Sequence, residues 1–404
     1  MYPRLITAMD QSTNSSAADS VTTNNGRKVS RAFAQWIVRW LLFFLICMSL
    51  GYASVERYQP RSAAGLTDAA VYYRLVAGQE VQGRDMRFRL LVPYVARPFY
   101  LLGSRFLNEE RSISLALLIA NAIFCATTAC LLVSVALRLT GKAAVALLAA
   151  CLYLLNFAVA NLQLAGMVDA GEACFMMALT WSLIFDRWRL LPVWGVCGAL
   201  AKETFVPLAG VFTLGWWLSI QREQSDRGSK LFWATAMFGL GIIAIIISRL
   251  SITASFDNPG TLAGSGGISA IAGGVAEGGL FLSNPGPGYL SRLTTTLSSR
   301  TFWYVFVWLL PLGLAGLKRL PRPWVIAAGV GGVLALGLGI YRNIEGNVAR
   351  PIFDVMGPML SLSAAIWLSR SPGENNSLPV DQHSATLRPG DVCNTTPDKL
   401  LESK

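Results

Sequence analysis

The chain has 404 residues and a net charge of +11, and it is 53% hydrophobic but only 14% charged. Soluble domains carry roughly 25% charged residues. Here the apolar residues fall in runs of about 16 to 25, the length needed to cross a hydrocarbon core of about 30 Å. This composition excludes a soluble globular protein. The basic residues mostly flank the apolar runs, where they orient a membrane protein, so nucleic acid is not an expected partner.

Histidine and cysteine usage narrows the possible chemistry. The single histidine, His383, lies in a polar tail, which excludes a Ser-His-Asp triad and a histidine zinc site. The seven cysteines show no paired spacing and mostly lie in or beside apolar runs. That placement is typical of small buried residues rather than of disulfides or metal ligands. Any reaction must therefore use carboxylates, Lys, Arg, Tyr or a metal site without histidine.

Polar tails flank the apolar part of the chain. Residues 1–32 are rich in Ser, Thr and Asn, and residues 370–404 are similar, so both tails are expected to be disordered. Residues 33–369 form the expected membrane domain, an all-α polytopic bundle of about ten spans. The expected spans are 33–52, 112–137, 143–161, 170–185, 190–201, 204–220, 231–249, 301–317, 324–341 and 351–369.

The spans 190–201 and 204–220 are separated only by a charged break. Lys202 and Glu203 interrupt one long apolar stretch, and Pro207 follows. Two short helices that meet at a charged point explain this pattern better than one very long helix.

The basic residues also predict an orientation. With ten spans, alternate loops carry most of the positive charge, whereas the loop 162–169 on the opposite side carries none. This asymmetry predicts that both termini lie in the cytoplasm. We identify no internal repeat, which disfavours an inverted-repeat transporter.

Two of the predicted outer loops are long. Residues 250–300 are rich in Gly, Ser and Pro, as a mobile flap would be. Residues 53–111 contain the amphipathic stretches VYYRLVAG and RLLVPYVARPFYLLGSRFL, and the second would lie well along a membrane interface. This loop also carries nine arginines on the side where positive charge is normally scarce. They either hold lipid phosphates or bind a phosphate-bearing substrate.

Asp68 in the first outer loop is a candidate functional residue. It lies four positions before Tyr72, which places both residues on one face of a short expected helix. The alternative is that Asp68 is the N-cap of that helix, since Thr67 and Asp68 precede an apolar run.

Asp169 and Glu172 form a carboxylate pair at the outer mouth of the fourth expected span. Their three-residue spacing places both carboxylates on one helical face. They are candidates for a general base or a metal-bridging pair. The alternative is favourable placement of acidic residues at a helix N-terminus.

The remaining candidates are ionisable residues at or near the membrane boundary. Lys202 and Glu203 are either functional or members of a structural ion pair, in which Lys202 would bind Glu203 or Asp169. Arg350 opens the last span and either contributes to the site or anchors the helix to lipid headgroups. The topology places all of these residues on one outer face, and such convergence is what a site requires.

At these residues the sequence resembles the GT-C class of membrane glycosyltransferases, which use polyprenyl-phosphate-linked sugars. The motifs are D-x-x-x-Y-Y-R-x-x-x-G (68–78) and F-R-L-L-V-P-Y-V-A-R-P (88–98) in the first outer loop. Val168-Asp169-Ala170, the A-K-E-T of residues 201–204, and Arg350 with Pro358 also match the class. The loop departs from several branches in carrying a lone Asp68 rather than an Asp-Glu pair.

The resemblance implies a role for each candidate residue. Asp68 would be the general base that deprotonates or positions an acceptor hydroxyl. Arg89, Lys202 and Arg350 would stabilise the charge of the departing lipid phosphate. The other implied substrate-binding residues are Tyr72, Tyr73, Asp169, Glu172 and Glu203. No metal ligand is assigned, and a divalent cation is left open as a cofactor.

The expected function is transfer of a sugar from a polyprenyl-phosphate donor to an acceptor at the outer, periplasmic face of a bacterial inner membrane. The expected partners are that lipid-linked donor and membrane lipids. Two alternatives remain. One is a transporter or flippase for a lipid-linked or anionic solute, and the other is a membrane protein whose outer loop binds a partner without catalysis.

Overall fold

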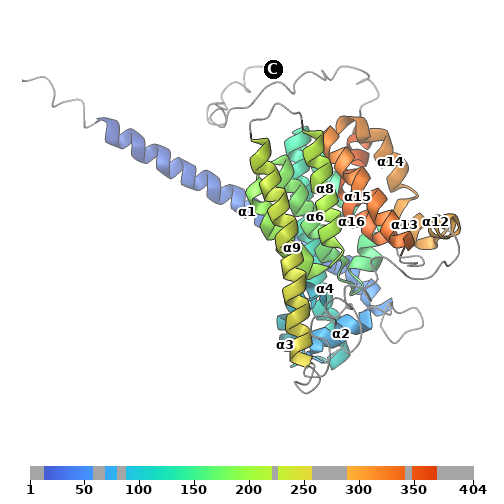
Figure 1. The fold of residues 1–404 in the computed structure, drawn as a ribbon. Coiled ribbons are helices and arrows are strands. Elements are labelled where there is room, and N and C mark those ends of the chain that lie inside the picture. The colour runs from blue at the N-terminus through green and yellow to red at the C-terminus, as the bar shows by residue number, and fades with distance from the viewer. Residues whose placement is uncertain are drawn as a thin grey trace, which may run out of the picture. The chain divides into compact units, whose positions relative to one another are not determined.

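The computed structural model describes residues 13–57, 69–79, 88–220, 226–256, 289–341 and 348–370. Residues 1–368 form one unit and residues 369–404 a second. All regular structure in the described residues is helical, and all of it lies in the first unit (Figure 1). Asp68, most of the loop 250–300 and the tail from residue 371 lie outside these ranges.

The helices follow one another along the chain with short connections in most places. In order they are α1 (Thr13–Arg57), α2 (Ala69–Ala77), α3 (Leu91–Gly103), α4 (Glu109–Thr140), α5 (Ala143–Leu154), η2 (Val159–Gln163), α6 (Asp169–Ile184), η3 (Trp188–Leu190), α7 (Leu191–Ala201), α8 (Phe205–Ser219), α9 (Arg227–Phe256), α12 (Tyr289–Leu297), α13 (Arg300–Phe306), α14 (Leu309–Gly316), η4 (Leu317–Arg319), α15 (Arg322–Tyr341) and α16 (Ala349–Leu368).

Each of the ten apolar segments expected from the sequence contains a helix, and the all-helical membrane fold is thereby confirmed. Five described helices are long and apolar enough to cross a bilayer, and α13 with the helices after it forms a sixth if that bent pair is counted as one span. The helices α5, α7 and α8 are apolar but shorter. The count of ten crossings stays a prediction.

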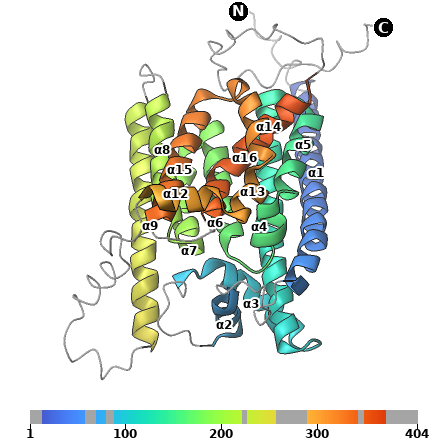
Figure 2. The same ribbon diagram turned by 90° about the vertical axis from the view of Figure 1, so that its right-hand side faces the viewer.

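Helix α4 is mostly buried by its neighbours. Its N-cap is Asn108, whose side chain accepts a hydrogen bond from the backbone N–H of Arg111, and Glu109 and Glu110 occupy its first turn. It ends at Gly141, whose φ of 67° suits a residue without a Cβ. Between these caps α4 packs against α1, α3, α5 and α6 (Figure 2).

The chain after α5 departs from the single span expected at 143–161. Helix α5 ends at Leu154, and the π-helix η2 follows. The amide of Asn156 explains the break, because it accepts a hydrogen bond from Ala158 N at 2.9 Å and donates one to Val305 O at 2.9 Å. A side chain that binds the backbone in this way competes with the regular helix.

The predicted charged break between two short helices is present. Helix α7 ends at Ala201, Lys202 has an extended backbone, and α8 begins at Phe205. Gly198 allows the two helices to lie close together, because a Cβ at this position would overlap the ring of Phe205. The hairpin therefore carries Lys202 and Glu203 at its tip.

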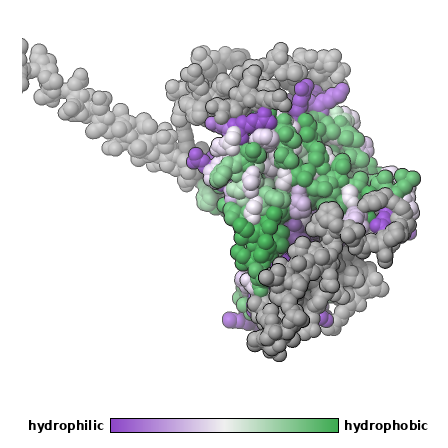
Figure 3. Space-filling model, in the orientation of Figure 1, coloured by the Kyte–Doolittle hydropathy of each residue, from purple (hydrophilic) through white to green (hydrophobic). Residues whose placement is uncertain are grey.

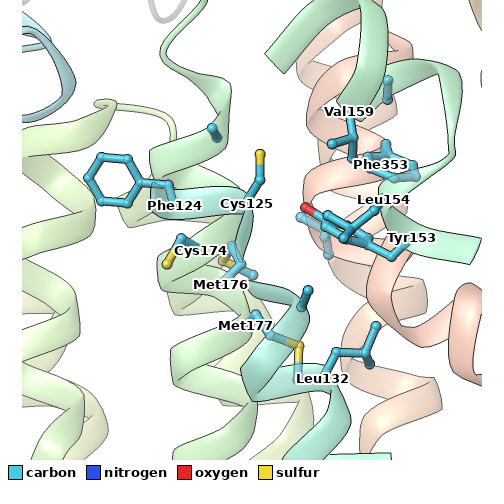
Figure 4. Close-up of a cluster of buried hydrophobic side chains, with 14 of the residues drawn as sticks. Phe124, Cys125, Leu132, Tyr153, Leu154, Val159, Cys174, Met176, Met177 and Phe353 are labelled. Carbon is cyan, nitrogen blue, oxygen red and sulfur yellow. The ribbon is translucent and has the colours of Figure 1, made fainter. Parts of the chain in front are cut away.

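A buried apolar core joins α4, α5, α6 and α16. Figure 4 shows Phe124 and Cys125 of α4 beside Cys174 of α6, with Tyr153 and Phe353 on the other side. The rings of Tyr153 and Phe353 stack with their centroids 5.4 Å apart. This core fixes the ends of these helices, where the polar residues lie.

Apolar side chains cover the sides of the bundle. On α9 they include Ile243, Ile246 and Ile247, all exposed. Figure 3 shows one face of the molecule coloured by hydropathy. An exposed apolar surface of this extent fits a lipid-facing wall. The chain is a multi-pass membrane protein.

The two amphipathic stretches of the first outer loop form α2 and α3, as predicted. Both helices lie at one end of the bundle (Figures 1 and 2), and α3 packs against α2, α4 and α7. The first turn of α6 lies beside α3 and α7, since a Cβ at Gly171 would be 3.0 Å from Val92 and 3.1 Å from Ala201. This end of the bundle holds the candidate site.

Candidate active site

Four sequence-remote segments meet at this end of the bundle. They are the first turn of α6, the turn between α7 and α8, the segment just before α3, and the first turn of α16. Their charged residues are connected by ion pairs. The connected side chains are Arg89, Asp169, Glu172, Lys202, Glu203 and Arg350.

Lys202 is the centre of the buried part of this network. Its Nζ lies 2.6 Å from Oδ1 of Asp169 and 2.5 Å from Oε2 of Glu172. The exposed fractions are 7% for Lys202, 2% for Asp169 and 0% for Glu172, so the three charges are almost fully removed from solvent. The other oxygen of Glu172, Oε1, accepts a hydrogen bond from Thr204 at 2.7 Å.

Arg350 adds a second cation to the same carboxylate. Its Nη1 donates to Oδ2 of Asp169 at 3.0 Å, so Asp169 binds one cation through each of its oxygens. The guanidinium reaches Asp169 because Arg350 occupies the first turn of α16, which packs against α6. Of the two ion-pair partners considered for Lys202, the structure shows Asp169 rather than Glu203. The functional roles of Lys202 and Arg350 stay predictions.

Arg89 forms a second, adjacent pair. Its Nε and Nη2 donate to the two carboxylate oxygens of Glu203 at 3.0 and 2.7 Å, and its Nη1 donates to the hydroxyl of Tyr72 at 2.9 Å. This two-point contact is the strong form of an Arg–carboxylate pair. It connects α2 and the start of α3 to the tip of the α7–α8 hairpin.

The electrostatics of Glu203 follow from this pairing. Burial raises the pKa of its carboxyl, but the charge and hydrogen bonds of Arg89 outweigh burial and lower that pKa from 4.5 to about 2. A carboxyl whose pKa is depressed in the folded state stabilises that state above its ordinary pKa. This contribution is lost as the pH falls towards the folded-state value.

Glu203→Gln is therefore expected to lower stability at neutral pH by about 1 to 3 kcal/mol. The gap between wild type and variant should close as the pH falls from about 4.5 to about 2, because the wild-type carboxyl is then protonated too. Thermal unfolding in detergent across this pH range measures the gap. A gap of constant size would contradict a charge-dependent role for Glu203.

The structure does not bring every predicted residue into this network. The hydroxyl of Tyr73 makes a short hydrogen bond with Ser114 on α4 instead. Asp68 directly precedes α2 in the sequence but lies outside the described residues. Its assignment as the catalytic base, and the alternative that it is a helix cap, both stay predictions.

Two site residues were not predicted from the sequence. Asp354 lies one turn after Arg350 on α16, and its Oδ1 accepts a hydrogen bond from Nε2 of Gln163 at 2.8 Å. Both side chains are buried. An aspartate in an otherwise apolar span is a sequence signal for a functional or paired group, whereas Gln163 has no comparable signal.

Three carboxylates of the site have the spacing that a divalent cation would need, but the ammonium group of Lys202 lies between two of them. Carboxylate oxygens of Asp169, Glu172 and Asp354 all lie within 4.8 Å of one another. The ammonium of Lys202, however, lies between Asp169 and Glu172 at hydrogen-bond distance from both. Among the described residues, Lys202 is thus the cation paired with both Asp169 and Glu172, and Arg350 is a second cation on Asp169.

Comparison with solved structures gives a match that covers most of the chain. No family model and no curated protein matches the chain. The structure is similar to the crystal structure of ArnT from Cupriavidus metallidurans bound to undecaprenyl phosphate, with a TM-score of 0.52 and 16% identity. The match covers 83% of this chain.

The chain has a GT-C-like fold. The fold class expected from the resemblance of short motifs is thereby confirmed. The match spans about 60% of the length of ArnT. At 16% identity this likeness establishes the fold alone.

Proposed function

We propose that the chain is an integral membrane glycosyltransferase, which moves a sugar from a polyprenyl-phosphate donor to an acceptor at the outer, periplasmic face of a bacterial inner membrane. Both termini would lie in the cytoplasm. The observation that carries this proposal is the network of Lys202, Asp169 and Arg350 at one end of a GT-C-like bundle. Buried ionisable residues in a membrane protein are costly, and such residues usually mark functional sites.

The proposed reaction is a single displacement at the anomeric carbon of the sugar. The acceptor oxygen forms a bond to that carbon while the bond from the carbon to the phosphate oxygen breaks, which inverts the configuration. The proton of the acceptor hydroxyl passes to the carboxylate of Asp68, and the electron pair of the broken bond remains on the lipid phosphate.

The arginines and the lysine supply the positive charge that this leaving group needs. Arg89 and Arg350 are held by carboxylates, and 13% and 11% of their side chains are exposed, so part of each remains accessible. Groups that are fixed before the reaction stabilise developing charge without reorganisation. In this proposal Lys202 does not contact the phosphate but holds Asp169, which in turn holds Arg350. Tyr72 orients Arg89 through their hydrogen bond.

The test is turnover by the purified full chain in lipid vesicles. We expect release of polyprenyl phosphate from a polyprenyl-phosphate sugar in the presence of a lipid acceptor, together with a glycosylated acceptor detected by mass spectrometry. Several donor sugars should be offered, because the sugar is not specified by the site. Movement of the intact labelled donor across the vesicle membrane without its cleavage would overturn the proposal in favour of a flippase.

Arg89→Lys is a variant matched to this assay, because it keeps the charge but loses the two-point contact with Glu203. We expect weaker binding of the lipid phosphate and slower turnover. An unchanged rate would remove Arg89 from the proposed site.

A further inference from the structure

Asp354 presents an unusual carboxyl group at the inner side of the site. It is 1% exposed and lies in the second turn of α16, one turn after Arg350. Its Oδ1 accepts the hydrogen bond from Gln163, but its Oδ2 has no hydrogen-bond partner among the described residues. A bare carboxylate oxygen in such a place carries a large desolvation cost.

The neighbours of Asp354 make that cost larger. Oxygens of Asp169 and Glu172 lie within 4.8 Å of one another and of an oxygen of Asp354. Both neighbouring carboxylates already form ion pairs. Asp169 pairs with Lys202 and Arg350, and Glu172 pairs with Lys202. Like charges at such a separation repel strongly where solvent is excluded.

The charges of this cluster do not balance if Asp354 is ionised. Among the described residues, three carboxylates would face the two cations Lys202 and Arg350, which leaves one negative charge in excess. The adjacent pair of Arg89 and Glu203 is balanced by itself.

The other polar groups near Asp354 do not supply the missing positive charge. Gln163 is neutral and already donates to Oδ1. Cys125 donates to Gln163 through its thiol, and Tyr153 on α5 is a neutral phenol. In the described part of the chain, no hydrogen bond connects the Tyr153 hydroxyl with Oδ2 of Asp354.

We propose that Asp354 is a proton-carrying positioning residue. Its carboxyl is neutral, the proton sits on Oδ2, and it is donated to an oxygen of Asp169 or Glu172. One proton thereby removes the excess charge, supplies the missing hydrogen bond and fixes the two carboxylates that hold Lys202 and Arg350. The effect on turnover rests on the proposed function, whereas the protonation itself does not.

The first test is the infrared spectrum of the purified full chain at neutral pH. The wild type should show the carbonyl absorption of a protonated carboxyl group, shifted by labelling with ¹³C-aspartate. This band should be missing from Asp354→Asn and should remain in the control Asp186→Asn, whose side chain is 69% exposed. A band that persists in Asp354→Asn, or its absence from the wild type, would overturn the proposal.

The second test compares two substitutions at the same position. Asparagine has the shape of a neutral carboxyl group and retains a donor, so Asp354→Asn should unfold within about 2 °C of the wild type. Asp354→Ala removes the donor and leaves Gln163 and the two carboxylates without their partner, so its unfolding temperature should fall clearly further. Equal losses in the two variants would contradict a protonated Asp354, because the amide donor would then not replace the hydrogen bond that the carboxyl proton is proposed to make.

A bound cation is the competing explanation, and the same variants separate it. Chain stripped with a chelator should show the same unfolding temperature with and without added Mg²⁺, Ca²⁺ or Mn²⁺. A rise for the wild type that is lost in Asp354→Asn would assign the excess charge to a metal ion and overturn the protonation. If the band and the stability pattern hold but no transfer activity is found, the proposed function fails while this inference stands.

Discussion

Lys202→Met is expected to produce the largest loss of stability of any substitution in the site. The lysine is buried between Asp169 and Glu172, and methionine would fill its volume without its charge. Removing one partner of a buried ion pair costs about 3 to 5 kcal/mol, because the remaining charges are left uncompensated. We therefore expect a strong decrease in unfolding temperature, measured in detergent on the full chain.

Lys230→Met is a matched control at another ion pair. Lys230 binds Asp186 at 2.9 Å, but the side chain of Asp186 is largely exposed. Such a pair contributes about 1 kcal/mol or less. Adding Glu172→Gln to Lys202→Met should restore part of the lost stability, because the amide removes one unpaired charge and still accepts from Thr204. If Lys202→Met and Lys230→Met lower the unfolding temperature by the same amount, the buried network does not stabilise the fold more than an exposed ion pair does.

Asp68→Asn is expected to have the largest effect on activity. If Asp68 removes the proton of the acceptor hydroxyl, an amide of the same size leaves that step without a base. Loss of a general base lowers the rate by about 10²- to 10⁴-fold. The measurement is kcat for sugar transfer, with binding of polyprenyl phosphate followed separately and expected to stay close to that of the wild type.

The alternative role of Asp68 gives a different result. A helix N-cap contributes about 1 kcal/mol, and asparagine is as good a cap as aspartate. A purely structural Asp68 would therefore leave both kcat and the unfolding temperature of Asp68→Asn almost unchanged, which would refute the catalytic assignment. Asp186→Asn controls for the chemical change at an exposed position.

Most of the fold could be predicted because its signals are local. Apolar runs of spanning length, flanked by basic residues, predicted helices that the structure contains. The break between α7 and α8 was also predictable, because Lys202 and Glu203 cannot continue an apolar span without cost. The end of α5 was not, since it depends on a hydrogen bond from Asn156 to Val305, a residue of a distant helix.

The site was predictable as a set of residues but only partly as a set of contacts. Topology alone placed Asp169, Lys202 and Arg350 on the same face, and they are in direct contact. The pairing of Arg89 with Glu203 could not be predicted, because it depends on the path of the chain from α2 to α3 across the hairpin tip. That choice is made by packing, which a single sequence does not encode in any short pattern.

Asp354 shows a different limit. It was not predicted as a site residue, because it lies within the last expected span and not at the membrane boundary, where the other candidates lie. An ionisable residue inside an apolar helix is a stronger signal of a functional or paired group than one at the membrane boundary, because its burial costs more free energy. The same rule that identified Lys202 would have identified Asp354.

The pairing of Arg350 with Asp169 also has a consequence for biogenesis. The two residues are 181 positions apart in the chain. A polypeptide is synthesised from its N-terminus, so α6 and the α7–α8 hairpin reach the bilayer long before α16 exists. During that interval Lys202 is the only described cation paired with Asp169 and Glu172. The nascent protein therefore carries an incompletely neutralised charge until α16 is inserted, and a chain truncated before α16 would retain it.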